Sequence, residues 1–167
     1  MSDWPTEEED LRPPVRAYLE DEGYEVRDEV WINGRIADLY AYCGDEEPLA
    51  VELKLTNWKK AVRQAQAYQL GAVFTYVALP ILHVPRVMRR AQDLRSRNVG
   101  LLGVAPGTGS GFQPASEELE HEPGDPDVRE LIEPGDSDRF LPFLATKIVD
   151  DAERPKRRET KMPRWRP

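Results

Sequence analysis

Two acidic residues and a lysine, spaced along two adjacent predicted strands, carry the chemistry that this sequence indicates. Asp38 is followed fourteen residues later by Glu52, and Lys54 lies two positions further on. Metal-dependent cleavage of a phosphodiester uses this set of groups: carboxylates that hold a divalent cation, and a lysine that supports the attacking water or the charge of the transition state. We therefore treat Asp38, Glu52 and Lys54 as candidate catalytic residues.

A hairpin is expected to bring these groups together. The segments Ile36–Cys43 and Leu49–Leu55 have the composition of β-strands, and residues 44–48 between them have the composition of a turn. If the hairpin folds about the middle of that turn, Asp38 and Glu52 face each other. Directly opposed residues of an antiparallel pair have Cβ atoms about 5 Å apart.

The charged residues of the second strand stand among apolar ones. Side chains alternate along a strand, so Lys54 is expected on the face of Glu52, while Leu53 points to the core. The apolar run Leu49-Ala50-Val51 before Glu52 favours a strand that is buried on both faces. A surface ion pair of Glu52 with Lys54 on a solvated face is the alternative to a catalytic pair.

The helix predicted after this strand adds two polar residues. Asn57 is a suitable N-cap, and apolar residues recur at helical spacing over Trp58–Leu70. Gln64 and Tyr68 lie one turn apart at the border of the apolar stripe, within reach of a metal-bound water or a DNA phosphate. The alternative is that Tyr68 belongs to the core and Gln64 is its polar neighbour.

On these residues, the chain resembles the PD-(D/E)XK (restriction-endonuclease-like) nuclease superfamily over about residues 11–104. The resemblance rests on Asp38, on the run from Glu52 to Lys54 and on the helix that follows. It implies that Asp38, Glu52 and the backbone carbonyl of Leu53 bind Mg²⁺ or Mn²⁺, and that Lys54 assists the nucleophile.

Further details of the resemblance concern single positions. The Q-x-x-x-Y pattern of Gln64 and Tyr68 is similar to that of RecB-like nuclease domains, which implies that both help to orient the nucleophile. Ala37 stands where the motif has its proline, a position that holds no metal. In some members a glutamate of the first helix adds to the metal site; Glu9 and Glu20 are candidates, and neither position is supported by spacing.

The order of the predicted elements is that of an α/β fold. A helix with Pro13-Pro14 in its first turn precedes a strand over Tyr24–Ile32. Beyond the hairpin and its helix, the run Val73–Leu79 is expected to be a strand parallel to the second hairpin strand. Helix Pro85–Asn98 and strand Val99–Val104 follow. We predict a restriction-endonuclease-like αβββαβ core with a central mixed sheet flanked by helices, plus an extra αβ unit and a C-terminal helix.

Composition divides the chain into four parts. Residues 1–104 are the nuclease-like domain, 105–138 an acidic Pro/Gly-rich linker expected to be mobile, 139–153 a C-terminal helix and 154–167 a basic tail. The tail holds seven basic residues and one glutamate, a net +6, in a chain of net charge −8. The C-terminal helix is expected to dock on the core or on a second subunit, which would form a homodimer.

Basic residues gather in two patches that suit nucleic-acid phosphates, one on the predicted helix 85–98 and one in the tail. A solvated helix face and a disordered charge run are the alternatives. The candidate nucleic-acid-binding residues are Arg86, Arg89, Arg90, Arg157 and Arg158.

These features predict a metal-dependent nuclease that hydrolyses DNA phosphodiester bonds in repair, recombination or restriction, with RNA left open as a substrate. The alternative is a catalytically inactive nucleic-acid-binding or protein-interaction module with the same fold. Cys43 is the sole cysteine, which fits a reducing cytoplasm. No hydrophobic run approaches about 20 residues, so we expect no association with a membrane.

Overall fold

A central six-stranded sheet organises the molecule, of which the computed structural model describes residues 5–44, 47–105 and 128–154. The strands are β1 (Glu25–Ile32), β2 (Arg35–Tyr42), β3 (Leu49–Leu53), β4 (Phe74–Pro80), β5 (Val99–Val104) and β6 (Val128–Ile132). They lie side by side in sequence order. The strands β3, β4 and β5 are parallel to one another, and the remaining neighbours are antiparallel.

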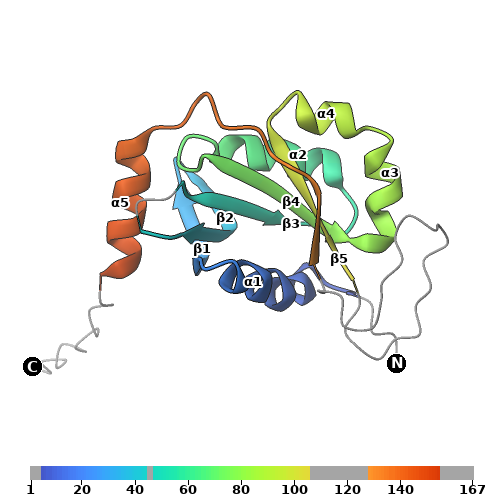
Figure 1. Ribbon diagram of the computed structural model, residues 1–167, viewed down its shortest axis with the longest axis horizontal. Coiled ribbons are helices and arrows are strands. Elements are labelled where there is room, and N and C mark those ends of the chain that lie inside the picture. The colour runs from blue at the N-terminus through green and yellow to red at the C-terminus, as the bar shows by residue number, and fades with distance from the viewer. Residues whose placement is uncertain (1–4, 45–46, 106–127, 155–167) are drawn as a thin grey trace, which may run out of the picture.

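Helices cover both faces of the sheet (Figure 1). They are η1 (Glu8–Leu11), α1 (Arg12–Asp21), α2 (Trp58–Tyr68), η2 (Ile81–His83), α3 (Val84–Met88), α4 (Ala91–Arg95) and α5 (Pro142–Glu153). The predicted αβββαβ order and the central mixed sheet flanked by helices are confirmed. No helix in the described part of the chain has the length and apolar character needed to cross a membrane.

The first three strands form a meander whose turns follow from local sequence. Asn33-Gly34 joins β1 to β2 with φ values of 49° and 82°, the left-handed backbone that a two-residue hairpin turn requires. Between β2 and β3, Leu39 pairs with Val51. One further step along this register leads from the paired residues to Asp38 on β2 and Glu52 on β3. The predicted register of the second hairpin is therefore confirmed.

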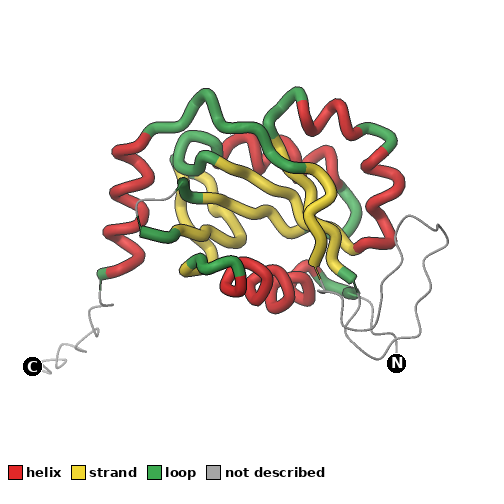
Figure 2. Tube along the Cα trace, in the orientation of Figure 1, coloured by secondary structure: helices red, strands yellow, loops and turns green. Residues whose placement is uncertain are grey.

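Alternation along the strands sorts the apolar side chains into two layers. Ala78 of β4 and Leu53 of β3 pack with the buried face of α1. Val77 and Leu79 of β4 point the other way and pack with α2, α3 and α4. Figure 2 shows the resulting three layers, with the sheet between α1 and the group of α2, α3 and α4. Every residue of β3 is buried, in agreement with the strand expected to be covered on both faces.

The segment predicted as one helix over Pro85–Asn98 forms two short helices instead. α3 ends at Met88 and α4 begins at Ala91, because Arg90 leaves the helical region with φ −117° and ψ 25°. Both helices still bury apolar residues against the same cluster, so the periodic pattern persisted across the break. Periodicity alone therefore gave no sign of the interruption.

Part of the predicted linker 105–138 is a strand. Residues 128–132 form β6, which pairs antiparallel with β5. Val128 and Ile132 are buried, but the acidic residues around them hid this short strand in the sequence. Residues 106–127 of the linker, and all of the basic tail after Arg154, lie outside the described residues.

α5 docks on the core of its own chain, which is one of the two arrangements expected for the C-terminal helix. Ile148 joins a cluster with Ile32 of β1 and Tyr68 of α2. The helix approaches closely at Gly71, where a Cβ atom would lie 2.9 Å from the Ile148 side chain. Phe143 on α5 stays 70% exposed, and the homodimer through this helix stays a prediction.

Candidate active site

Asp38 and Glu52 meet where β2 and β3 run side by side. Glu52 is only 5% exposed, and Asp38 is half-buried. The Asp38 carboxylate reaches across to β3, where Oδ2 accepts a hydrogen bond of 2.8 Å from the backbone N–H of Leu53. The side chain of Asp38 is thus oriented by the neighbouring strand. The structure brings together the two carboxylates that the sequence singled out.

Tyr68 of α2 belongs to the same site. Its hydroxyl lies 2.5 Å from Oε2 of Glu52 and 2.8 Å from the carbonyl oxygen of Ile36. The phenol ring is buried, so Tyr68 is a core residue and also a direct partner of the carboxylate. The alternative that places Tyr68 in the core is confirmed, and its reach to a metal-bound water or a DNA phosphate stays a prediction.

Gln64 lies one turn before Tyr68 on α2. Its side-chain oxygen Oε1 is buried and has no hydrogen-bond partner among the described residues. A buried amide oxygen without a partner is costly, by about 1–3 kcal/mol, unless it serves something that binds there. The Gln64 amide is therefore an acceptor that remains available to a bound water or ligand.

Lys54 lies directly beyond the end of β3, where its backbone N–H donates to the carbonyl oxygen of Ala78 at 3.0 Å. Its ammonium Nζ is 3.0 Å from Oε1 of Glu8 on η1. Lys54 is close enough to Glu52 to favour the ionised form of that carboxylate. The lysine is thus part of the site, but in this structure its direct partner is Glu8.

Glu8 is a site residue that the sequence did not reveal. Its charge raises the pKa values of both Asp38 and Glu52, which places it near the carboxylate pair. Of the two glutamates considered from the sequence, Glu9 forms an ion pair with Arg12 instead. Glu8 sits in a single 3₁₀ turn ahead of α1, and so short an element has no periodicity that would show where its side chains point.

Arg12, at the start of α1, is a second residue that sequence reasoning missed. Its guanidinium donates a hydrogen bond of 2.6 Å to the backbone carbonyl of Asp38. Nη2 of the same group lies 4.0 Å from Oδ1 of the Asp38 carboxylate and 2.8 Å from Glu9. Arg12 therefore joins α1 to β2 and puts a positive charge beside Asp38.

Burial makes ionisation of both carboxylates unfavourable. It raises the pKa of Glu52 to about 7; the hydrogen bond from Tyr68 opposes the rise, and the charge of Asp38 adds to it. Burial also raises the pKa of Asp38, against the opposing effects of the Leu53 N–H and of Arg12. Two carboxylates that repel each other in a poorly solvated site are the setting in which a bound hard cation is stabilising.

The donor set fits a magnesium-type cation. Among the described residues, no group of three or more histidine, cysteine, aspartate or glutamate side chains is arranged to hold a metal ion. Mg²⁺, however, is commonly bound by one or two carboxylates, with waters and substrate phosphates as its other ligands. Oε1 of Glu52 accepts no hydrogen bond from the described residues, and Oδ1 of Asp38 has only the distant contact with Arg12. The Leu53 carbonyl as a further ligand stays a prediction.

The predicted nucleic-acid-binding arginines divide into two groups. Arg86 on α3 is exposed, as are Arg89 and Arg90 in the break between α3 and α4. Arg157 and Arg158 lie outside the described residues. The three described arginines belong to the helical layer on the face of the sheet that α2 covers.

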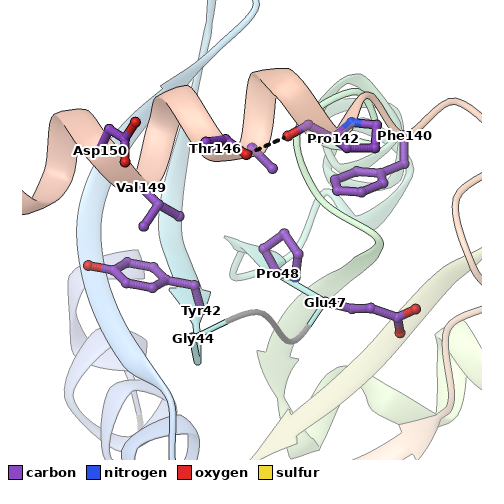
Figure 3. A pocket seen from close by; sticks show the side chains of 10 residues that line it. Tyr42, Gly44, Glu47, Pro48, Phe140, Pro142, Thr146, Val149 and Asp150 are labelled. Carbon is purple, nitrogen blue, oxygen red and sulfur yellow. Dashed lines mark hydrogen bonds between the residues drawn. The ribbon is translucent and has the colours of Figure 1, made fainter.

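A pocket lies apart from the carboxylate pair, where α5 meets the turn between β2 and β3. Its volume is about 360 Å³. Figure 3 shows Tyr42 and Pro48 on one side of this pocket and the side chains of α5 on the other. No candidate catalytic residue is among the described residues that line it. The pocket is therefore not the site of the predicted chemistry.

Comparison with known proteins gives a fold and no activity. No family model matches the chain, and no curated protein matches it. A solved structure of a protein of unknown function from Silicibacter pomeroyi is similar, with a TM-score of 0.54 and 15% sequence identity. The match covers 84% of this chain and 79% of that one. At this identity the likeness shows a shared α/β fold alone.

Proposed function

We propose that this protein is a nuclease of the PD-(D/E)XK (restriction-endonuclease-like) type, which uses Mg²⁺ or Mn²⁺ to hydrolyse phosphodiester bonds in DNA. The observation that carries the proposal is the meeting of a buried carboxylate, Glu52, with a half-buried one, Asp38, whose ionised forms lack full compensation within the protein. Tyr68 contacts Glu52, and Lys54 is close enough to favour its ionised form. Gln64 lies one turn before Tyr68 on α2, and the order of helices and strands agrees with such a core.

Each residue has a role that its surroundings support. A divalent cation, when bound, would offset negative charge on the phosphate and lower the pKa of a nearby water. Asp38 and Glu52 would hold it through the carboxylate oxygens that lack close partners. Tyr68 keeps Glu52 in place, and the unpartnered amide oxygen of Gln64 would accept a hydrogen bond from the attacking water.

Lys54 would stabilise the negative charge that grows on the phosphate during cleavage. In the structure its ammonium group is held by Glu8, which is about half exposed. The Glu8 side chain is 46% exposed and that of Lys54 is 18% exposed, so solvent reaches this ion pair from the Glu8 side and substrate phosphate would compete with Glu8 for Lys54. Roles in repair, recombination or restriction, a cytoplasmic location and RNA as a second substrate belong to the same proposal.

A second candidate is an inactive nucleic-acid-binding or protein-interaction module that keeps the fold. It is favoured by the contacts of Lys54 with Glu8 and of Arg12 with Asp38, because protein cations then compensate part of the charge that a metal would neutralise. Such a module would bind its partner equally well with and without Mg²⁺, and it would cleave no DNA.

Cleavage assays separate the two candidates. The purified chain is incubated with supercoiled, linear, single-stranded and branched DNA in Mg²⁺, in Mn²⁺ and in EDTA. We expect cleavage in the presence of either metal and none in EDTA. Asp38→Asn and Lys54→Ala should each lower the rate by at least about 100-fold, as loss of a metal ligand or of a group that stabilises the transition state does.

Matched variants control for charge and folding. Asp136→Asn and Lys147→Ala remove the same charges from exposed positions outside the site and should cleave at the wild-type rate. Circular dichroism establishes that every variant is folded. If the Asp38 and Lys54 variants keep wild-type activity, the assignment of the site is wrong. If the wild-type protein cleaves none of the four substrates with either metal, the module is the better account.

A further inference from the structure

A strongly basic surface covers one layer of this acidic protein. Between Trp58 and Asn98 the chain has eight basic residues and one acidic residue, Asp93, a net +7. The whole chain carries −8, so its other residues sum to −15. The segment contains α2, α3 and α4, which share one hydrophobic cluster and lie on the same face of the sheet (Figure 1). Positive charge is therefore concentrated on this helical layer.

These cations are not compensated within the described structure. All eight basic residues are exposed, and none of them forms an ion pair with another described residue. Like charges gathered on neighbouring helices repel and lower stability unless a polyanion neutralises them. A phosphate backbone is the polyanion that suits such an array, because it carries regularly spaced charges.

The same layer contains a small pocket with an aromatic wall. It lies between α2 and α4, is about 220 Å³ in volume, and is lined by Trp58, Lys59, Val62, Arg63, Asp93 and Arg97. Trp58 is partly buried against the core, which keeps the indole ring from moving freely. The ammonium group of Lys59 lies 5.7 Å from the centre of that ring. Arg97 is held by a 2.8 Å hydrogen bond to Gln66.

The chemistry of this pocket is that of a nucleotide site. An indole ring offers a surface on which any base can stack, and Lys59 and Arg63 beside it are suited to the adjoining phosphates. The carboxylate of Asp93, the one acid of the layer, is an acceptor for an N–H of a base, such as the ring N–H of thymine or the amino group of cytosine. A base within a duplex is stacked and paired and is not free to enter, whereas a base in a single strand is.

We infer that the pocket between α2 and α4 binds a base of single-stranded DNA, whose phosphates lie along the basic surface of α2, α3 and α4. This inference deepens the proposed function, on which its choice of ligand rests, and names a single strand as the substrate. Trp58 follows Lys54 by four residues. The pocket therefore lies only a few residues along the chain from the end of β3, which carries Glu52.

Binding is tested without catalysis, by fluorescence anisotropy in EDTA with the full-length chain. The probes are a labelled oligothymidylate and a labelled duplex of equal length. We expect the single strand to bind at least about 10-fold more tightly than the duplex. Trp58→Ala should weaken single-strand binding by about 5- to 100-fold, the range found when a stacking aromatic residue is lost. Trp58→Phe should recover most of the affinity.

Additional variants keep the test decisive if Trp58→Ala is unstable. Arg63→Glu changes an exposed residue that lines the pocket, and it should weaken binding by at least about 5-fold. Phe143→Ala and Lys147→Ala remove an exposed aromatic and an exposed cation from α5, and binding should stay at the wild-type level.

Equal affinity for single strand and duplex, or wild-type binding by Arg63→Glu, would overturn the inference. So would polyglutamate that displaces the probe as well as unlabelled single strand does, because that result would indicate an acidic protein as partner. The outcome is independent of the proposed hydrolysis. Tight single-strand binding without cleavage in Mg²⁺ or Mn²⁺ would support the binding pocket and refute the nuclease activity. Cleavage without a preference for single strands would support the nuclease activity and refute the binding pocket.

Discussion

Replacing Glu52 by glutamine should raise the free energy of unfolding of the metal-free protein at high pH and leave it nearly unchanged at low pH. Glu52 is buried, and burial raises its pKa from 4.5 to about 7. Ionisation of this group therefore opposes folding. The contribution of Glu52 to the free energy of unfolding is therefore fully present below about pH 4.5, falls as the pH rises, and is lost above about pH 7.

The size of the effect follows from the shift. One pKa unit corresponds to about 1.4 kcal/mol, so a rise from 4.5 to about 7 gives a loss of about 3 kcal/mol at pH 8. Glutamine has nearly the same shape, and its side-chain oxygen can still accept the hydrogen bond from Tyr68. The stability of Glu52→Gln relative to wild type should thus rise by about 2–3 kcal/mol between pH 4.5 and pH 8.

Urea denaturation in EDTA, followed by circular dichroism at several pH values, measures this difference. Contributions from other titrating groups are shared by both proteins and largely cancel. Glu130→Gln is the matched control: Glu130 also accepts from a tyrosine hydroxyl at 2.5 Å, that of Tyr76, but it lies on an exposed position of β6. A difference between Glu52→Gln and wild type that stays constant from pH 4.5 to pH 8 would refute the reasoning.

Two further substitutions test the contacts that position the site. Tyr68→Phe removes the hydroxyl that Glu52 and the Ile36 carbonyl share, and it should cost about 1–3 kcal/mol in urea denaturation; an unchanged midpoint would show that this hydrogen bond contributes nothing net. Gly71→Ala would place a methyl group 2.9 Å from Ile148, so it should cost about 1–3 kcal/mol and speed amide hydrogen exchange in α5; normal exchange there would contradict the close docking of this helix.

The hairpin with its carboxylates could be predicted because three local signals agree. An apolar run marked β3, turn residues marked its start, and a register centred on the turn set Asp38 against Glu52. The position of Tyr68 on α2 followed from the helical period, and its hydroxyl reaches Glu52 in the structure. Features set by local pattern were therefore accessible.

Features that depend on packing between distant segments were not accessible. Glu8 and Arg12 come to the site because α1 crosses the face of the sheet, and no spacing in the sequence records that crossing. β6 was hidden because Val128 and Ile132 are its only fully buried residues, in an acid-rich stretch of sequence. The break at Arg90 keeps the apolar period, so it left no signal in the pattern.

The most direct test of the central claim is a crystal structure of the protein grown with MnCl₂, with anomalous diffraction recorded to locate manganese. The account predicts one strong anomalous peak bound by the carboxylates of Asp38 and Glu52, and no such peak in crystals of Asp38→Asn. A structure in which these two side chains remain without metal at saturating Mn²⁺, with Arg12 and Lys54 as the cations beside them, would contradict it.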